Sequence, residues 1–234
     1  MKLVIFDVDG TLLDNMESEE ACYSSALREG LGITALDTDW RTYEHVTDEG
    51  VALEAYRRAC GGTPSSELMG HTVARFVTLL SDAHLRTPLR PIAGTAELLA
   101  ALPKHGWSIA LATGAWGQAA RFKLAAAGLL VDRIPLATAE DGPARVAIVQ
   151  AAWARAVSGR PAFEQVLLVG DAVWDAAAAQ AMRLPFVGRA TGARAAELRT
   201  HGATAVLPDF TDFGAVILAF ETSVGLSPAG FVPR

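Results

Sequence analysis

Short apolar runs that favour β-strands alternate with longer, often alanine-rich helical stretches through most of the sequence. The first run, at residues 3–6, is apolar at every position, which is typical of a strand buried on both faces of a parallel sheet. Comparable runs follow at residues 108–113, 133–138, 165–170, 185–190 and 204–209. This alternation predicts βαβ units, and therefore an α/β fold built on a doubly wound, Rossmann-like parallel sheet.

Residues 15–89 depart from this alternation. They contain three stretches with helical periodicity, polar starts and glycine breaks, and no convincing buried strand lies between these stretches. Pro88, Pro91 and Gly94 then mark a linker back to the sheet. We therefore predict a small helical domain at residues 15–89, inserted into an α/β core domain that is formed by residues 1–14 and 90–234.

Composition narrows the class of protein. A chain of 234 residues with 51% hydrophobic residues can bury one substantial core. The formal net charge of −6 disfavours nucleic acid as the main ligand, because phosphate backbones are bound chiefly by clustered Lys and Arg. No apolar stretch approaches the roughly 20 residues that span a bilayer, and the N-terminus lacks the pattern of a signal peptide. We therefore expect a cytoplasmic protein that binds neither nucleic acid nor membrane; the sequence leaves its oligomeric state open.

Four aspartates follow two of the predicted strands. Asp7 and Asp171 each end a strand, at the edge where open parallel sheets place their chemistry. Asp9 would project to the same side as Asp7 from extended chain, and Asp175 lies one helical turn beyond Asp171. Taken singly, each could be a turn former or a helix cap. Gly10 would let the chain turn sharply beside a ligand.

A cluster of these four carboxylates would require a cation, since uncompensated buried charges cost several kcal/mol each. Oxygen ligands of this kind suit Mg²⁺, which keeps several waters and bridges to phosphate. Thr113 and Gly114 follow another predicted strand and precede a helix, so they could cradle a phosphate group. The alternative is that this Thr-Gly pair only turns the chain.

Three motifs carry a resemblance to a known family. The segment DVDGT at residues 7–11, the strand end at Thr113 and the segment GDAVWD at residues 170–175 resemble the haloacid dehalogenase superfamily, in its phosphatase branch. The resemblance covers essentially the whole chain, and residues 15–89 are similar to the superfamily's α-helical cap, as in phosphoglycolate phosphatase-like members. It implies a small phosphorylated metabolite as substrate and Mg²⁺ as cofactor.

The resemblance also implies roles for individual residues. Asp7 would be the nucleophile that forms an aspartyl phosphate, and Asp9 the acid/base that protonates the leaving alcohol and later activates water. Asp7, the backbone carbonyl of Asp9 and Asp171 would hold Mg²⁺, with Asp175 supporting the site. Thr113 would hold the transferring phosphoryl group. Substrate binding is expected at Gly10, Thr11, Thr113, Gly114 and Arg145.

The sequence departs from the family at one position. Members usually have a lysine that opens the helix before the GDxxxD strand, but residues 138–156 contain no lysine. Arg145, in the first turn of the predicted helix, is the best substitute as the catalytic cation. Its guanidinium can neutralise Asp7 and the phosphate but cannot lose its proton. A helix-surface arginine is the alternative.

Two further features stay open at this stage. Trp116 and Trp174 could line the crevice, although packing in the core or against the cap is favoured. Residues 43–50 form a polar turn between cap helices, which either lies over the site and selects the substrate or is a simple solvated turn.

The resemblance allows more than one function. The favoured reading is a phosphatase that acts on a small molecule such as phosphoglycolate or a sugar phosphate. A phosphomutase would share the aspartyl phosphate but return the phosphoryl group to the substrate. The missing lysine also allows a catalytically impaired phosphate-binding relative. A phosphonate hydrolase ranks low, because residues 3–103 lack the lysine expected in its cap.

Overall fold

A six-stranded parallel sheet forms the centre of the molecule, in the order β3-β2-β1-β4-β5-β6. The computed structural model describes residues 1–14, 18–159 and 162–225. Its strands are β1 (Lys2–Phe6), β2 (Trp107–Ala112), β3 (Leu136–Ala137), β4 (Gln165–Gly170), β5 (Phe186–Arg189) and β6 (Ala205–Leu207). Every run predicted to be a strand overlaps one of these elements, so the predicted α/β fold is confirmed.

The register of the central strands sets where the chain leaves the sheet. Phe6, the last residue of β1, lies opposite Leu111 of β2 and Val169 of β4. The backbone N–H of Asp7 still donates to the carbonyl of Val169, at 2.9 Å. The segments that follow β1, β2 and β4 therefore emerge side by side at one edge of the sheet.

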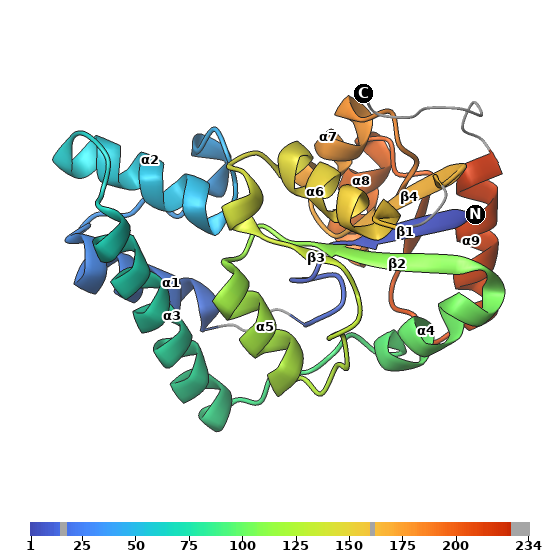
Figure 1. The fold of residues 1–234 in the computed structure, drawn as a ribbon, viewed down its shortest axis with the longest axis horizontal. Coiled ribbons are helices and arrows are strands. Elements are labelled where there is room, and N and C mark those ends of the chain that lie inside the picture. The colour runs from blue at the N-terminus through green and yellow to red at the C-terminus, as the bar shows by residue number, and fades with distance from the viewer. Residues whose placement is uncertain (15–17, 160–161, 226–234) are drawn as a thin grey trace.

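Helices cover both faces of this sheet (Figure 1). The helices of the α/β part are α4 (Thr95–Ala101), α5 (Gly117–Ala126), α6 (Arg145–Val157), α7 (Val173–Ala181), α8 (Gly192–Thr200) and α9 (Phe213–Gly225). Short 3₁₀ turns occur at η2 (Leu102–His105) and η3 (Ala139–Asp141). Across residues 1–14, 18–159 and 162–225, no helix combines the length and hydropathy that a membrane span requires.

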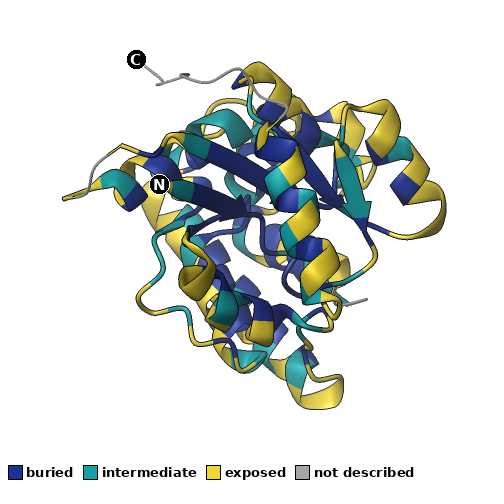
Figure 2. Cartoon of the chain, turned by 90° about the vertical axis from the view of Figure 1, so that its right-hand side faces the viewer, coloured by how far each residue is buried: buried dark blue, intermediate teal, exposed yellow. Residues whose placement is uncertain are grey.

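Two hydrophobic clusters explain why β1 is apolar at successive positions. Leu3 and Ile5 pack into the cluster formed with α6, α7 and α8. Val4 and Phe6 point the other way, into the cluster formed with α4, α5 and α9. Figure 2 shows the strands as the buried centre of the molecule, with the exposed residues mostly on the outer helices and loops. Side chains alternate across a strand, so both faces of β1 need apolar residues.

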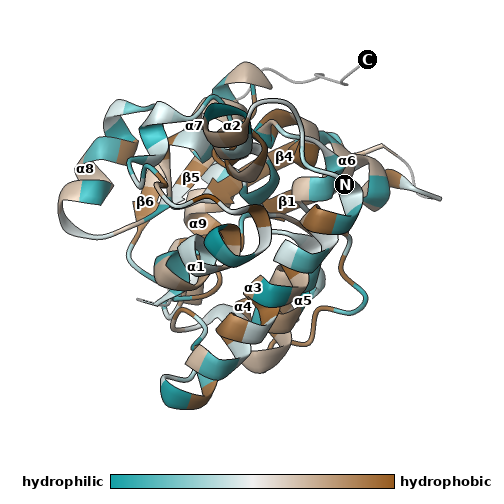
Figure 3. Ribbon diagram, turned by 90° about the vertical axis from the view of Figure 1, so that its left-hand side faces the viewer, coloured by the Kyte–Doolittle hydropathy of each residue, from teal (hydrophilic) through white to brown (hydrophobic). Residues whose placement is uncertain are grey.

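Three helices are inserted between β1 and β2: α1 (Glu19–Leu31), α2 (Asp48–Cys60) and α3 (Ser66–Arg86). We call them the inserted helices; a 3₁₀ turn, η1 (Trp40–Thr42), lies between the first two. Helix α3 packs against α1 and α5, and Figure 3 shows hydrophobic and hydrophilic residues alternating around it. The three predicted helical stretches are thus confirmed, and no strand is found among the described residues of this insertion.

The two connections to the inserted helices run beside each other. Leu13 bridges to Pro91, and the N–H of Asp14 donates to the carbonyl of Arg90 at 2.9 Å. Residues 15–17, where the predicted domain boundary falls, lie outside the described part. The division into two domains at residues 14/15 and 89/90 stays a prediction.

Replacement of Gly94 by alanine tests the packing of the segment that leads from the inserted helices back to α4. Gly94 has φ +81°, and a Cβ there would lie 2.3 Å from the backbone C and O of Phe210. Gly106 has nearly the same φ, +80°, but no atom within 4 Å of such a Cβ. We expect Gly106→Ala to cost about 1–2 kcal/mol, the penalty of the left-handed conformation. Gly94→Ala should cost about 1–3 kcal/mol more, because overpacking adds to that penalty.

Urea unfolding of the two variants and the wild-type protein measures both costs. Equal losses of stability in Gly94→Ala and Gly106→Ala would contradict the close packing of Gly94 against Phe210.

Candidate active site

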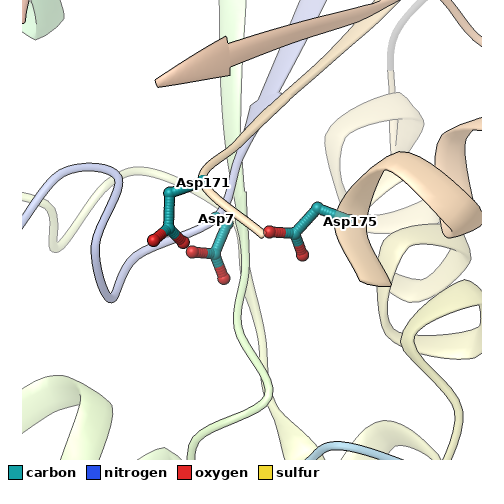
Figure 4. Close-up of side chains that lie close together, drawn as sticks. All are labelled: Asp7, Asp171 and Asp175. Carbon is teal, nitrogen blue, oxygen red and sulfur yellow. The ribbon is translucent and has the colours of Figure 1, made fainter. Parts of the chain in front are cut away.

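Three buried aspartates converge at the edge of the sheet where β1 and β4 end (Figure 4). Asp7 follows β1, Asp171 follows β4, and Asp175 lies in the first turn of α7. One carboxylate oxygen from each lies within 4.8 Å of those of the other two. The structure therefore brings together, from positions far apart in sequence, three of the four aspartates singled out above.

The turn after Asp7 allows this approach. Gly10 has φ +77°, and a Cβ at this position would lie 2.2 Å from a carboxylate oxygen of Asp171. The hydroxyl of Thr11, which is fully buried, donates to Asp7 Oδ2 at 3.1 Å. Neither residue lines the cavity described below. Gly10 and Thr11, which were expected to bind substrate, are therefore placed where they support the carboxylates.

Arg145 reaches this cluster from the first residue of α6. Its Nη1 donates to Asp7 Oδ1 at 3.1 Å, and its Nε lies 3.3 Å from Asp175 Oδ1 without hydrogen-bond geometry. The side chain is only 13% exposed, which excludes a helix-surface arginine. Gly114 leaves room for it, since a Cβ there would lie 3.1–3.2 Å from guanidinium atoms.

Asp9 is paired with a residue that the sequence analysis missed. Lys123 of α5 is fully buried, and its Nζ lies 2.6 Å from Asp9 Oδ1 and 2.5 Å from Glu19 Oε1. A sequence signal existed, because Lys123 falls at helical spacing on the same face as the buried Ala119 and Ala120. A lysine on the apolar face of a helix becomes buried, and a buried lysine needs a carboxylate partner.

Asp171 has a cation of its own, Arg194 of α8. The guanidinium of Arg194 donates to a carboxylate oxygen and, at 3.2 Å, to the backbone carbonyl of Asp171. The Arg194 side chain is about half exposed. The sequence contains no clear signal for it, since this arginine opens an ordinary polar helix.

The start of α2 is fastened to the loops around the site. Asp48 donates its N–H to the carbonyl of Gly114 at 2.7 Å and accepts the Trp116 N–H at 2.9 Å. The hydroxyl of Thr47 donates to the carbonyl of Pro143 at 3.1 Å. Trp116 is fully buried and packs against aromatic residues of α1 and α3, as the favoured reading expected.

A cavity of about 310 Å³ lies between the aspartates and the inserted helices. Asp7, Asp9, Thr113 and Gly114 line it from the α/β part, and Arg145, Asp171, Trp174 and Arg194 also contribute to this side. The loop 46–48 lines the opposite wall, so the turn between the helices lies over the site. Thr113 is buried, and its Oγ1 accepts the N–H of Ala115 at 3.1 Å.

Comparison with known proteins identifies the family. The family model for haloacid dehalogenase-like hydrolase matches residues 1–183. The chain belongs to the haloacid dehalogenase-like hydrolases. No curated protein matches the sequence.

Several solved structures share the fold of this chain. A hydrolase from Pseudomonas syringae is 24% identical, with a TM-score of 0.68 over 93% of this chain and 98% of its own. CbbY from Rhodobacter sphaeroides, solved with phosphate, is 22% identical, with a TM-score of 0.64 over 91% and 96%. A candidate beta-phosphoglucomutase from Bacteroides vulgatus is 19% identical, with a TM-score of 0.64 over 96% and 90%.

In this haloacid dehalogenase-like hydrolase, burial disfavours the ionised forms of the three clustered aspartates. Burial and the charge of Asp175 raise the pKa of Asp7 well above its usual range, and Arg145 opposes that rise. Burial and Asp175 likewise raise the pKa of Asp171 to about 6, against the effect of Arg194. Burial also raises the pKa of Asp175 itself. Added positive charge would therefore stabilise the ionised forms of all three.

The donor set fits a hard divalent cation. Asp7 and Asp171 offer carboxylate oxygens at the cavity, and no described nitrogen or sulfur ligand joins them. Asp175 Oδ2 instead accepts the N–H of Ala172 at 3.2 Å, which ties it to the turn after β4. The family generally uses a divalent metal; that the metal here is Mg²⁺, with the Asp9 carbonyl as a ligand, stays a prediction.

Asp48→Asn tests the electrostatics at the start of α2. Burial raises the pKa of Asp48 from 3.8 to about 7, opposed chiefly by Lys123, while Glu19 and Asp9 add to the rise. Between about pH 4 and pH 7 the unfolded chain has lost this proton and the folded protein has kept it, so wild-type stability falls as pH rises. The stability of Asp48→Asn relative to the wild-type protein should therefore grow over this window and level off above it.

Urea unfolding at a series of pH values measures this difference. Asp132→Asn, an exposed aspartate replaced in the same way, is the matched control and should show little change with pH. A stability difference for Asp48→Asn that does not vary between pH 4 and pH 8 would contradict the raised pKa.

Proposed function

We propose that the protein is a magnesium-dependent phosphatase, which hydrolyses a small-molecule phosphate monoester through an aspartyl phosphate on Asp7. The observation that carries this proposal is the position of Asp7. It lines the cavity, in contact with the cation of Arg145 and beside the carboxylate of Asp171. Carboxylates are known nucleophiles in phosphoryl transfer, which depends mainly on positioning and charge neutralisation.

In the first step, a carboxylate oxygen of Asp7 attacks phosphorus and the bond to the leaving oxygen breaks. Asp9 gives its proton to that oxygen, so the alcohol leaves neutral. Arg145 and the Thr113 hydroxyl stabilise the phosphoryl oxygens. The Thr113 oxygen accepts the Ala115 N–H, and its hydroxyl hydrogen would be donated to the phosphoryl group. Bound Mg²⁺ would supply positive charge that keeps Asp7 ionised and neutralises the phosphate.

In the second step, Asp9 accepts a proton from water, and the resulting hydroxide oxygen attacks phosphorus. The bond to Asp7 breaks, inorganic phosphate leaves, and both aspartates return to their starting states. Lys123 holds Asp9 at one carboxylate oxygen, 2.6 Å from Nζ, which fixes its orientation toward the cavity. The inserted helices would act as the cap, and their closure over the site would exclude bulk water.

The two alternative functions receive less support. A phosphomutase that passes through a bisphosphate needs cations for a second phosphate. The basic side chains among the described lining residues, Arg145 and Arg194, both lie on the side of the aspartates. A catalytically impaired relative was suggested by the missing lysine, but Arg145 provides a buried cation in contact with Asp7.

Asp7→Asn is the direct test of the proposed function. The amide lacks the negative charge and the nucleophilicity of the carboxylate, so phosphate release from a panel of monoesters should fall by about 10³-fold or more. EDTA should abolish wild-type turnover and added Mg²⁺ should restore it. Asp132→Asn, at an exposed position, is the control and should retain activity.

Circular dichroism and thermal unfolding establish that Asp7→Asn is folded. A folded Asp7→Asn protein with wild-type activity would exclude Asp7 as the nucleophile. If the wild-type protein instead produced isomerised substrate and no free phosphate, that would support a phosphomutase.

Substitution of Arg145 tests whether it acts as the catalytic cation. Arg145→Ala removes the charge beside Asp7 and should lower kcat/KM by about 10²–10³-fold, as expected for a lost charge-stabilising group. Arg145→Lys, which restores the charge without the guanidinium fork, should recover part of this loss. Arg121→Ala, on the exposed face of α5, is the matched control. Equal activity of Arg145→Ala and Arg121→Ala would remove Arg145 from the mechanism.

A further inference from the structure

The two walls of the cavity differ in chemistry. The wall formed by the α/β part holds the aspartates and both lining arginines, so it is the side where a phosphoryl group would bind. The wall formed by the inserted helices and their loops faces the rest of the substrate, namely the leaving alcohol. Its composition therefore bears on the identity of that alcohol.

The wall facing the alcohol is lined by acidic side chains and by no basic ones among the described inserted helices. Glu19, Glu20 and Asp48 line it, and the described inserted helices contribute no lysine or arginine to the lining. The nearby Lys123 is shared between Asp9 and Glu19, one ammonium for two carboxylates. Glu20 is exposed, and no ion pair is found for it among the described residues. A second anionic group on the substrate would meet repulsion here.

Aromatic side chains complete the same wall. Tyr23, Trp40 and Phe76 all line the cavity. The ring of Tyr23 lies 6.2 Å from that of Trp40 and 5.5 Å from that of Phe76, centroid to centroid, so the three rings belong to one aromatic cluster. Aromatic faces attract organic cations through their quadrupole, and more strongly where water is excluded. The volume of about 310 Å³ lies at the small end of ligand sites and suits a compact molecule.

On this basis, and resting on the phosphatase activity proposed above, we infer that the leaving group is a cationic amino alcohol. The substrate class is then a compact phosphate monoester of an amino alcohol, with its ammonium group against these aromatic rings and the carboxylate of Glu20. Phosphoglycolate fits less well, because its carboxylate would face these acidic side chains. The inference likewise disfavours a bisphosphate such as the xylulose-(1,5)bisphosphate bound by a CbbY mutant.

Substrates whose leaving groups have the same shape but different charge show whether charge or size sets the preference. Phosphocholine and its uncharged carbon analogue, 3,3-dimethylbutyl phosphate, differ only in the charged nitrogen, and phosphoglycolate supplies an anionic leaving group. We expect kcat/KM for phosphocholine to exceed that for the carbon analogue about tenfold, the size of a desolvated cation–π contact. Phosphoglycolate should be the poorest of the three. Equal kcat/KM for the two matched substrates, or faster turnover of phosphoglycolate, would overturn the inference.

p-Nitrophenyl phosphate keeps the two proposals separable. Its hydrolysis depends on the phosphoryl site and not on a cationic leaving group. Turnover of p-nitrophenyl phosphate without a preference for phosphocholine overturns the amino-alcohol inference alone. Loss of turnover on every monoester overturns the phosphatase proposal itself.

Glu20→Gln tests the inference at one residue. Glu20 is exposed on α1, so its replacement by an isosteric amide should leave the fold intact. The ratio of kcat/KM for phosphocholine over 3,3-dimethylbutyl phosphate should fall at least about threefold, mainly through KM, as one electrostatic contact is lost. Glu97→Gln, on the exposed face of α4, is the matched control and should preserve the ratio. An unchanged ratio in Glu20→Gln would count against the inference.

Discussion

The crowding of buried carboxylates at one edge of the sheet is the constraint on which the rest of the site depends. Burial raises the pKa of Asp7, Asp171 and Asp175, and the nearby charge of Asp175 raises the pKa of the other two further. Isolated buried charges are too costly to persist, so each must be compensated by a cation or by protonation. Two helices supply cations to this cluster, since α6 contributes Arg145 and α8 contributes Arg194. A third cation, Lys123 of α5, pairs with the neighbouring Asp9.

Lys123 extends this electrostatic arrangement to the inserted helices. Its ammonium lies between Asp9, which follows the central strand, and Glu19, the first residue of α1. Hydrogen bonds at the start of α2 also attach the inserted helices to the α/β part, since Asp48 binds the loop that follows β2 and Thr47 binds the loop that precedes α6. The inserted helices are thus held over the cavity by polar contacts at its rim and by the aromatic cluster around Trp116.

The sequence predicts the framework better than the site. Strands such as β1 and β4 are recognisable because both faces of the sheet are covered, which demands apolar residues at every position. Asp7 and Asp171 are recognisable because strand ends in parallel sheets converge. Lys123 and Arg194 escape this reasoning, since their partners are fixed by how helices pack, and sequence spacing within a helix does not reveal which carboxylate a long side chain will meet.

The arginine at position 145 is intelligible only together with its neighbours. A guanidinium presents nitrogens in a flat fork, so one side chain can approach Asp7 through Nη1 and Asp175 through Nε. An ammonium is a single point charge and lacks this planar set of separate nitrogens. The fork is also broader, and Gly114 provides the space, since a Cβ there would lie 3.1–3.2 Å from guanidinium atoms. Arg145 and Gly114 therefore fit as a pair, which places a buried positive charge beside Asp7.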